Sequence, residues 1–210
     1  MPPRVKGFFV TLEGGDGTGK STQARALARW LRSQGSVVHL TREPGGTVLG
    51  ERVRQALLAK QPLDAWTEML LFQALRAQHA AEVIRPQLSR GRVVVCDRYA
   101  DSTMAYQGYG LGLDRRLIDA IARVVTRGAV PDLTMILDAA PADWLRRARR
   151  RTRMERRGLA FQRRVRAGFL AIARRNPARC RVIRVQPDPA VTQQLIRRAV
   201  RDALQRRRRP

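Results

Sequence analysis

The stretch GGDGTGKST, from Gly14 to Thr22, constrains the fold of this chain more than any other. In it a glycine is followed by four residues and then by Gly-Lys-Ser, between a strand-like run, Phe8–Glu13, and a helix-like pattern over 22–34. Glycines let backbone N–H groups turn onto a phosphate, and the positive end of the helix adds to the attraction. The stretch therefore predicts a loop that binds the phosphates of a nucleoside triphosphate. The predicted loop consists of Gly14, Gly15, Asp16, Gly17, Thr18, Gly19, Lys20, Ser21 and Thr22.

Four polar side chains in and near this loop have the chemistry that phosphates require. The Lys20 amine is expected to reach the β- and γ-phosphates, and the Ser21 hydroxyl is expected to bind Mg²⁺. Asp16 in the loop and Asp97 at the end of a later strand are candidates for holding the magnesium ion, its water or a phosphate-gripping arginine. The competing interpretations are a glycine-rich turn without a ligand and, for Asp97, a simple cap after a strand.

Strands and helices alternate along the chain, which indicates the fold class. Of the apolar runs, three are continuous and rich in β-branched residues, as is typical of a parallel sheet covered on both faces. The alternation predicts a single doubly wound α/β domain over residues 1–210. The expected strands are Phe8–Glu13, Val37–Leu40, Arg92–Asp97, Leu133–Asp138 and Arg181–Val185. The expected helices are 22–34, Val48–Leu58, Asp64–Ser89, Arg115–Arg127, Ala142–Arg151, Ala160–Arg174 and Pro189–Gln205.

The charge of the chain is strongly positive and unevenly distributed. The formal net charge is +25, and residues 131–210 hold 23 of the 42 basic side chains but 6 of the 17 acidic ones. Such a field favours anionic partners, either nucleotides or polynucleotides. Nucleic-acid binding is the less favoured of the two, because the basic residues of the C-terminal part are not interleaved with aromatic residues that stack on bases.

The sequence also bears on the cellular compartment. No run of 18 apolar residues occurs, so a membrane span is not expected. The chain reaches its first strand-like run at Phe8 without the apolar region of a signal peptide, which favours a cytoplasmic protein. Cys96 and Cys180 are too few for a disulfide framework and are expected to be buried thiols.

Two polar clusters follow expected strands, at the edge where open α/β sheets bind ligands. They are TREPGGT, Thr41–Thr47, and DRYADSTMAYQG, Asp97–Gly108. Arg42 and Arg98 in these clusters can grip a second phosphate with the two prongs of a guanidinium group. The sequence therefore predicts a site for a phosphorylated acceptor beside the triphosphate loop.

Between these clusters lies a helical stretch, EMLLFQALRAQ, suited to binding a base. Glu68, Phe72 and Arg76 are spaced by four residues and share one helix face. An aromatic ring with an arginine one turn away can stack on a base and bond to its edge, although a core role for Phe72 is the alternative. In the next cluster, two further i, i+4 pairs supply neutral polar groups that suit a base edge and a sugar. These pairs are Ser102 with Tyr106 and Thr103 with Gln107.

Taken together, the motifs LEGGDGTGKST, TREPGGT, EMLLFQALR, RPQL and VCDRYADSTMAYQG resemble the thymidylate kinase family over nearly the whole chain. The resemblance implies a P-loop kinase fold with a five-stranded parallel sheet flanked by helices on both faces. It implies transfer of a phosphoryl group from Mg²⁺-ATP to dTMP, and a homodimer. Phe72 would stack on thymine, Arg76 would bond to its edge or to the acceptor phosphate, and Arg98 would grip the 5′-phosphate. Thr103 and Gln107 would read thymine, and Tyr106 would crowd the position of a ribose 2′-hydroxyl. The implied dTMP-binding residues are Arg42, Glu43, Pro44, Phe72, Arg76, Arg98, Ser102, Thr103, Tyr106 and Gln107.

The arginine-rich stretch LRRARRRTRMERR, Leu145–Arg157, corresponds in this resemblance to a small lid. Family members without an arginine at the position of Gly17 carry catalytic arginines in the lid, in a segment matched here by TRME, where Thr152 replaces the usual acid. We therefore expect a lid at about 146–158, with Arg153 and Arg149 joining Lys20 and Asp97 as catalytic residues. Other arginines of the stretch, Arg146 and Arg157 among them, are expected to be solvated spectators, and 206–210 is expected to be a frayed tail.

Two alternatives to this reading stay open at the level of sequence. One is a kinase of another nucleoside monophosphate or of a deoxynucleoside, and the combination of Phe72, Thr103 and Gln107, together with a comparison of acceptors, distinguishes the two readings. The other is a nucleic-acid-binding protein with a nucleotide loop, whose binding would fall steeply with salt concentration.

Overall fold

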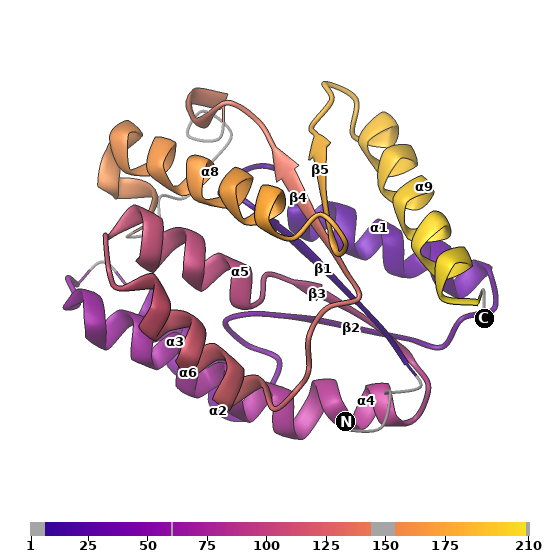
Figure 1. The fold of residues 1–210 in the computed structure, drawn as a ribbon, viewed down its shortest axis with the longest axis horizontal. Coiled ribbons are helices and arrows are strands. Elements are labelled where there is room, and N and C mark those ends of the chain that lie inside the picture. Colours follow the sequence, from indigo (N-terminus) through magenta and orange to yellow (C-terminus); the bar gives the residue numbers. More distant parts are fainter. Residues whose placement is uncertain (1–6, 60, 144–153, 209–210) are drawn as a thin grey trace.

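The computed structural model describes residues 7–59, 61–143 and 154–208. Its centre is a sheet of five parallel strands in the order β2-β3-β1-β4-β5 (Figure 1). This confirms the expected fold class. Every residue of the central strand β1 is buried, as its continuous apolar sequence predicts. The strands are β1 (Phe8–Gly14), β2 (Val38–Arg42), β3 (Val93–Asp97), β4 (Leu133–Asp138) and β5 (Cys180–Arg184).

Helices cover both faces of the sheet (Figure 1). Helices α1 and α9 pack on one face, and α8, α4 and the segment after β3 pack on the other. The α-helices are α1 (Lys20–Ser33), α2 (Val48–Leu58), α3 (Ala65–His79), α4 (Arg85–Ser89), α5 (Ala100–Thr103), α6 (Arg115–Thr126), α8 (Gly158–Arg175) and α9 (Pro189–Arg208). The described ranges also contain two π-helical segments, η1 (Ala80–Ile84) and η2 (Met104–Gly110), and a 3₁₀ turn, η3 (Glu155–Arg157).

Several helix boundaries differ from the expected ones. The expected helix Asp64–Ser89 is one continuous stretch of α3, η1 and α4, with the wider π turn just ahead of Pro86, which has no N–H to donate. The expected frayed tail is wrong for residues 206–208, which belong to α9. Arg207 donates to the Gly7 carbonyl at 2.5 Å and to Asp132 at 3.2 Å, so the last turn is tied to the start of β1.

The helical segment after β3 was not among the expected elements. Residues 100–110 are helical, and most of them are buried on more than one side, so they lack the apolar stripe of an amphipathic helix. The expected helix Ala142–Arg151 falls largely outside the described residues. None of the helices in the described ranges is long and apolar enough to cross a membrane.

Two glycines bring α8 close to η2. A Cβ atom at Gly168 would lie 2.7 Å from the Cβ of Tyr109, and one at Gly110 would lie 2.6 Å from the ring of Phe161. The same contact buries Tyr106 against the rings of Phe161 and Phe169. Helix α8 therefore holds η2, with its polar residues Tyr106 and Gln107, in a fixed position.

We predict that Gly168→Ala destabilises the protein by about 1–3 kcal/mol, because the added methyl group meets the rigid Cβ of Tyr109. Alanine is the better helix former by roughly 0.5–1 kcal/mol, so a change that met open space would stabilise instead. Urea unfolding monitored by circular dichroism measures the difference. Ala167→Gly, at the exposed neighbouring position, reports the helix-propensity term alone. If Gly168→Ala stabilised the protein by as much as Ala167→Gly destabilises it, the close packing of Gly168 against Tyr109 would be contradicted.

Candidate active site

A cleft of about 850 Å³ opens at the carboxyl ends of β1, β2 and β3. It is lined by most of the residues that the sequence singled out, from the phosphate loop, the two polar clusters and helix α3. Of the predicted site residues, those lining the cleft are Asp16, Gly17, Gly19, Lys20, Ser21, Thr22, Arg42, Glu43, Pro44, Phe72, Arg76, Asp97, Arg98, Ser102, Thr103, Tyr106 and Gln107.

The phosphate loop curls around the amine of Lys20. Gly17 and Gly19 have φ values of 77° and 87°, in the left-handed region that favours glycine, and α1 begins directly after the loop. The Lys20 amine donates to the Gly15 carbonyl at 2.5 Å and to the Thr18 hydroxyl at 3.4 Å. Burial, helped by the nearby Arg98 guanidinium, lowers the pKa of Lys20 to about 8. The loop thus places a cation and the N-terminus of α1 together.

Ser21 and Asp97 lie side by side, as a magnesium site requires. The Ser21 hydroxyl donates to Oδ2 of Asp97, and Oδ1 of Asp97 is buried with no hydrogen-bond partner among the described residues. A hydroxyl oxygen beside an unsatisfied carboxylate oxygen fits a hard divalent cation, which takes its other ligands from phosphates and water. No cluster of three acidic, histidine or cysteine ligands occurs in the described parts of the chain. The residues present therefore fit a magnesium ion bound together with a nucleotide.

Arg98 joins the phosphate loop to the segment after β3. Its guanidinium donates to the Gly14 carbonyl at 3.1 Å, to Ser102 at 3.2 Å and to Tyr106 at 3.3 Å, and it forms an ion pair with Asp16. The Tyr106 hydroxyl donates to the other oxygen of Asp16 at 3.0 Å. Burial alone would raise the pKa of Asp16, but Arg98 and Lys20 lower it. Of the roles considered for Asp16, the structure shows contact with an arginine.

Glu13 lies beneath this assembly and was not singled out in the sequence. It is the penultimate residue of β1, is completely buried, and accepts from the Tyr99 backbone N–H at 2.8 Å and the Ser102 hydroxyl at 2.5 Å. Burial, with the Asp101 carboxylate nearby, raises the pKa of Glu13 to about 8. Both bonds hold the backbone around Arg98, whose φ of 69° is left-handed. An acid within an otherwise apolar strand is the signal that could have identified it.

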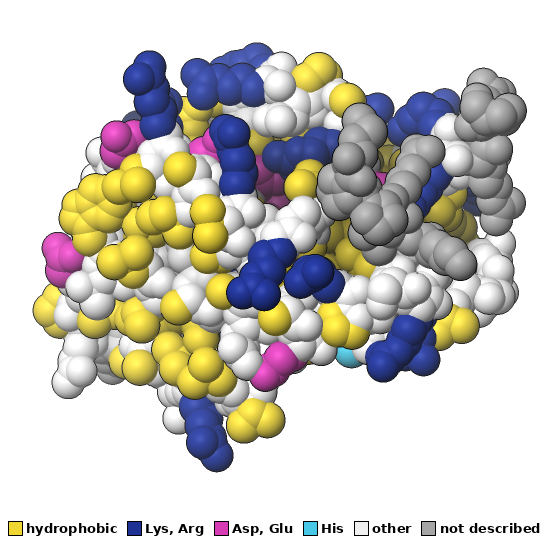
Figure 2. Space-filling model, turned by 60° about the horizontal axis from the view of Figure 1, so that its bottom comes forward, with side chains coloured by type: hydrophobic (Ala, Val, Ile, Leu, Met, Phe, Trp, Pro, Cys, Tyr) yellow, Lys and Arg dark blue, Asp and Glu magenta, His cyan; other side chains and the backbone are white. Residues whose placement is uncertain are grey.

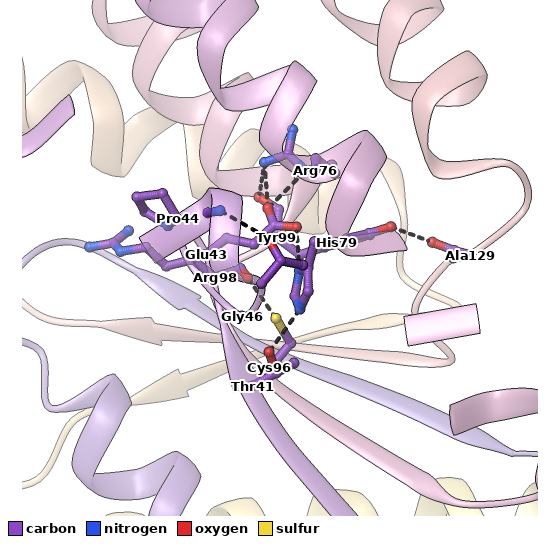
Figure 3. Close-up of polar contacts among 12 residues, drawn as sticks. Thr41, Glu43, Pro44, Gly46, Arg76, His79, Cys96, Arg98, Tyr99 and Ala129 are labelled. Carbon is purple, nitrogen blue, oxygen red and sulfur yellow. Dashed lines mark hydrogen bonds and ion pairs between the residues drawn. The ribbon is translucent and has the colours of Figure 1, made fainter. Parts of the chain in front are cut away.

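A second buried network holds Arg76 (Figure 3). Glu43 accepts a hydrogen bond from Nε of Arg76 at 2.9 Å and pairs with Nδ1 of His79 at 3.0 Å. The other ring nitrogen of His79, Nε2, bonds to the Thr41 hydroxyl at 2.7 Å. Arg76 also donates to the Thr103 hydroxyl at 3.0 Å. Its side chain is therefore fixed by protein groups, and its predicted contact with an acceptor stays a prediction. His79 and Thr41 were not among the predicted site residues, although His79 follows Arg76 by three residues on the same helix.

The remaining acceptor-side residues line the cleft in different ways. Phe72 is partly buried and packs against the cluster that contains Tyr106. Arg42 lies on the exposed rim, paired with Glu51 at 2.9 Å, and Pro44 follows a cis peptide bond after Glu43. Phe72 thus both packs against this cluster and lines the cleft, so the structure allows it a packing role and a binding role.

Of the residues named for the predicted lid, the structure describes only some. Arg146, Arg149, Arg153 and Thr152 lie outside the described residues. The expectation that Arg157 is a solvated spectator is wrong, because its guanidinium donates to both oxygens of the buried Glu68, at 3.2 and 2.9 Å. The reason is the burial of Glu68, whose carboxylate needs a cationic partner that sequence spacing alone does not reveal.

Comparisons with known proteins agree with this geometry. The thymidylate kinase family model matches residues 12–196. A thymidylate kinase of Thermomicrobium roseum is 46% identical over 206 residues, covering 96% of this chain and 98% of the relative. One from Solidesulfovibrio magneticus is 49% identical over 194 residues, covering 87% and 93%. The crystal structure of thymidylate kinase from Ehrlichia chaffeensis superposes with a TM-score of 0.78 at 39% identity, covering 93% of this chain and 98% of the other. The chain therefore belongs to the thymidylate kinase family.

Proposed function

We propose that this protein transfers the γ-phosphoryl group of ATP to dTMP, forming ADP and dTDP for dTTP synthesis. The observation that carries the proposal is the position of Arg98. Its two terminal nitrogens bond both to Gly14 and Asp16 of the phosphate loop and to Ser102 and Tyr106 after β3, in a cleft that residues of both polar clusters line. A donor and an acceptor phosphate can therefore meet at one arginine. The family relationship supports the same reaction.

Catalysis in this cleft consists of positioning and charge neutralisation. The transferring phosphoryl group passes through a loose transition state, so the protein needs to form no covalent bond to it. The acceptor phosphate is already ionised near neutral pH, so no general base is required. The Lys20 amine would contact the β- and γ-phosphates of ATP, and the Arg98 guanidinium would bind the 5′-phosphate of dTMP. Both cations are largely withdrawn from water, which strengthens their effect on developing charge.

A magnesium ion would be held by Ser21, directly or through water with Asp97. The unsatisfied Oδ1 atom of Asp97 supports this placement. When bound, the ion neutralises charge on the ATP phosphates. Asp16 was a further candidate ligand, but its two oxygens bond to Arg98 and Tyr106, which favours a role in orienting the arginine.

The base and sugar of dTMP would lie on the α3 and η2 side of the cleft. Phe72 would stack on thymine, and Thr103 and Gln107 would face its polar edge. Tyr106, fixed by Asp16 and Arg98, would leave no room for a ribose 2′-hydroxyl. The phosphate loop has glycine at position 17, so we assign neutralisation of the γ-phosphoryl group to Arg153, with Arg149 second, in the predicted lid.

A homodimer would cover the apolar side chains exposed on three neighbouring helices. Figure 2 shows hydrophobic side chains gathered on one side of the molecule. Helix α3 packs against both α2 and α6, so their outer faces form one surface. Sedimentation velocity should give twice the monomer mass of 23.7 kDa. The apolar residues exposed on these three helices are Val48, Leu49, Trp66, Leu70, Leu117 and Val124.

Both cysteines are free thiols, which supports a cytoplasmic location.

The direct test of the function is ADP production from ATP with dTMP, dUMP, dCMP, dAMP and dGMP as acceptors. We expect dTMP to give the highest kcat/KM. Lys20→Ala should lower turnover by about 10²-fold or more with the fold retained, because the positive charge that contacts the transferring phosphoryl group is lost. A preference for another monophosphate, or full turnover in Lys20→Ala, would refute the assignment.

The lowered pKa of Lys20 predicts that ATP binding weakens at alkaline pH. The amine carries its proton below about pH 8 and loses it above, so the Kd for ATP should rise by up to about tenfold per pH unit between pH 8 and 9.5. Calorimetric titrations at several pH values measure this dependence. The pKa of Glu13 also lies at about 8, so its titration could cause a similar change. The arginine in Lys20→Arg keeps its proton throughout, so a nearly flat profile in this variant would assign the pH dependence to Lys20. The same alkaline loss in both proteins would show that another group is responsible.

A further inference from the structure

Glu68 is a buried carboxylate between three segments of the acceptor side. It lies in the first turn of α3, and its side chain has no exposed surface. Oε1 accepts from the side-chain nitrogen of Gln107, on η2, at 2.8 Å. Arg157, at the end of η3, donates to both carboxylate oxygens. Glu68 thus connects Gln107, which lines the cleft, to an arginine that does not.

Arg157 is held in place on two sides. Its guanidinium lies 5.2 Å from the centre of the Phe161 ring, and its two-pronged contact with Glu68 has a shortest distance of 2.9 Å. Such a fork fixes the plane of the carboxylate as well as its position. It also supplies the positive charge that a buried carboxylate requires. The ion pair therefore holds Glu68 as a rigid acceptor.

This rigid acceptor determines which way the amide of Gln107 points. An ionised carboxylate has only acceptor atoms, so the Gln107 side chain must turn its NH₂ group, and not its oxygen, toward Glu68. The amide oxygen is then left to accept a hydrogen bond from another group. If an amide replaced the Glu68 carboxylate, either end of the Gln107 amide could face it. The orientation of Gln107 thus depends on the Glu68–Arg157 pair.

The orientation matters because pyrimidine bases differ at N3. Thymine and uracil carry a proton on N3 and donate, whereas cytosine has a lone pair there and accepts. An amide oxygen facing N3 pairs with the first kind and repels the second. We propose that Glu68 and Arg157 are positioning residues that fix Gln107 as an acceptor for the N3–H group, and so select thymine over cytosine. The proposal rests on the assignment of the cleft to dTMP.

The test compares nucleotide binding and turnover in Glu68→Gln and Arg157→Met. Glu68→Gln keeps the volume of the side chain but can accept or donate, so it releases the constraint on the amide. The dTMP/dCMP ratio of affinities, measured by calorimetry, should fall by about tenfold or more, the loss expected for one mispaired group at a base edge. The KM for dTMP should rise while the KM for ATP stays within about twofold. The dTMP/dUMP ratio should not change, because both bases carry N3–H.

Arg164→Met provides a matched control. Arg164 lies over the same Phe161 ring at 5.9 Å, but it donates to the Gly110 carbonyl at 3.1 Å and not to Glu68. The substitution removes the same charge from α8, the helix that follows η3, and should leave the dTMP/dCMP ratio unchanged. The double variant Glu68→Gln/Arg157→Met should lose little more selectivity than either single variant, because both act through one amide.

An unchanged dTMP/dCMP ratio in Glu68→Gln and Arg157→Met would overturn the proposal. So would equal losses for both nucleotides together with a lowered unfolding temperature, since that pattern describes a purely structural ion pair. If Arg157→Met does not fold, Arg157→Lys, which keeps a charge but not the fork, takes its place. Binding ratios are measured without turnover, so a wild-type protein that selects thymine but phosphorylates nothing would count against the proposed function alone.

Discussion

The guanidinium of Arg98 is the group on which the arrangement of the cleft depends. Its Nη1 atom bonds to the Gly14 carbonyl and to Ser102, and its Nη2 atom bonds to Asp16 and Tyr106, so each nitrogen contacts both the phosphate loop and the segment after β3. Glu13 supports it from beneath by accepting from the backbone of Tyr99. A left-handed backbone at a residue other than glycine persists where the surroundings enforce it, and such positions are frequent at functional sites. The donor loop and the acceptor segment therefore cannot move independently without breaking these bonds.

Ion pairs between an arginine and a buried carboxylate recur in and around this site. Arg76 pairs with Glu43 at 2.8 Å, Arg157 with Glu68 at 2.9 Å and, away from the cleft lining, Arg179 with Asp101 at 2.6 Å. Removing one partner of a buried pair costs several kcal/mol, because the other charge is left without compensation in a poorly solvated place. Such pairs add less to stability than apolar packing does, but they hold side chains in one geometry. In a chain of net charge +25, a small set of buried acids thus determines where particular arginines lie.

The sequence was most informative where local chemistry and position along the chain coincide. The phosphate loop, five strands and most cleft residues follow from motifs at strand ends, because parallel strands bring their carboxyl ends to one edge. It was least informative where partners are distant in sequence. Glu13 meets Ser102 across 89 positions, and Arg157 meets Glu68 across 89 as well. The helix after β3 was missed because tertiary burial, and not an amphipathic pattern, stabilises it.

Binding of dTMP and of thymidine to the wild type and to Arg98→Gln tests most directly the claim that Arg98 anchors the acceptor phosphate. Thymidine lacks the phosphate, so its affinity reports the base and sugar pocket alone. We predict that the wild type prefers dTMP by about 10–100-fold and that Arg98→Gln loses most of this preference, with the Kd of thymidine changed only a few-fold. A full preference for dTMP in Arg98→Gln, with thymidine binding intact, would contradict the account.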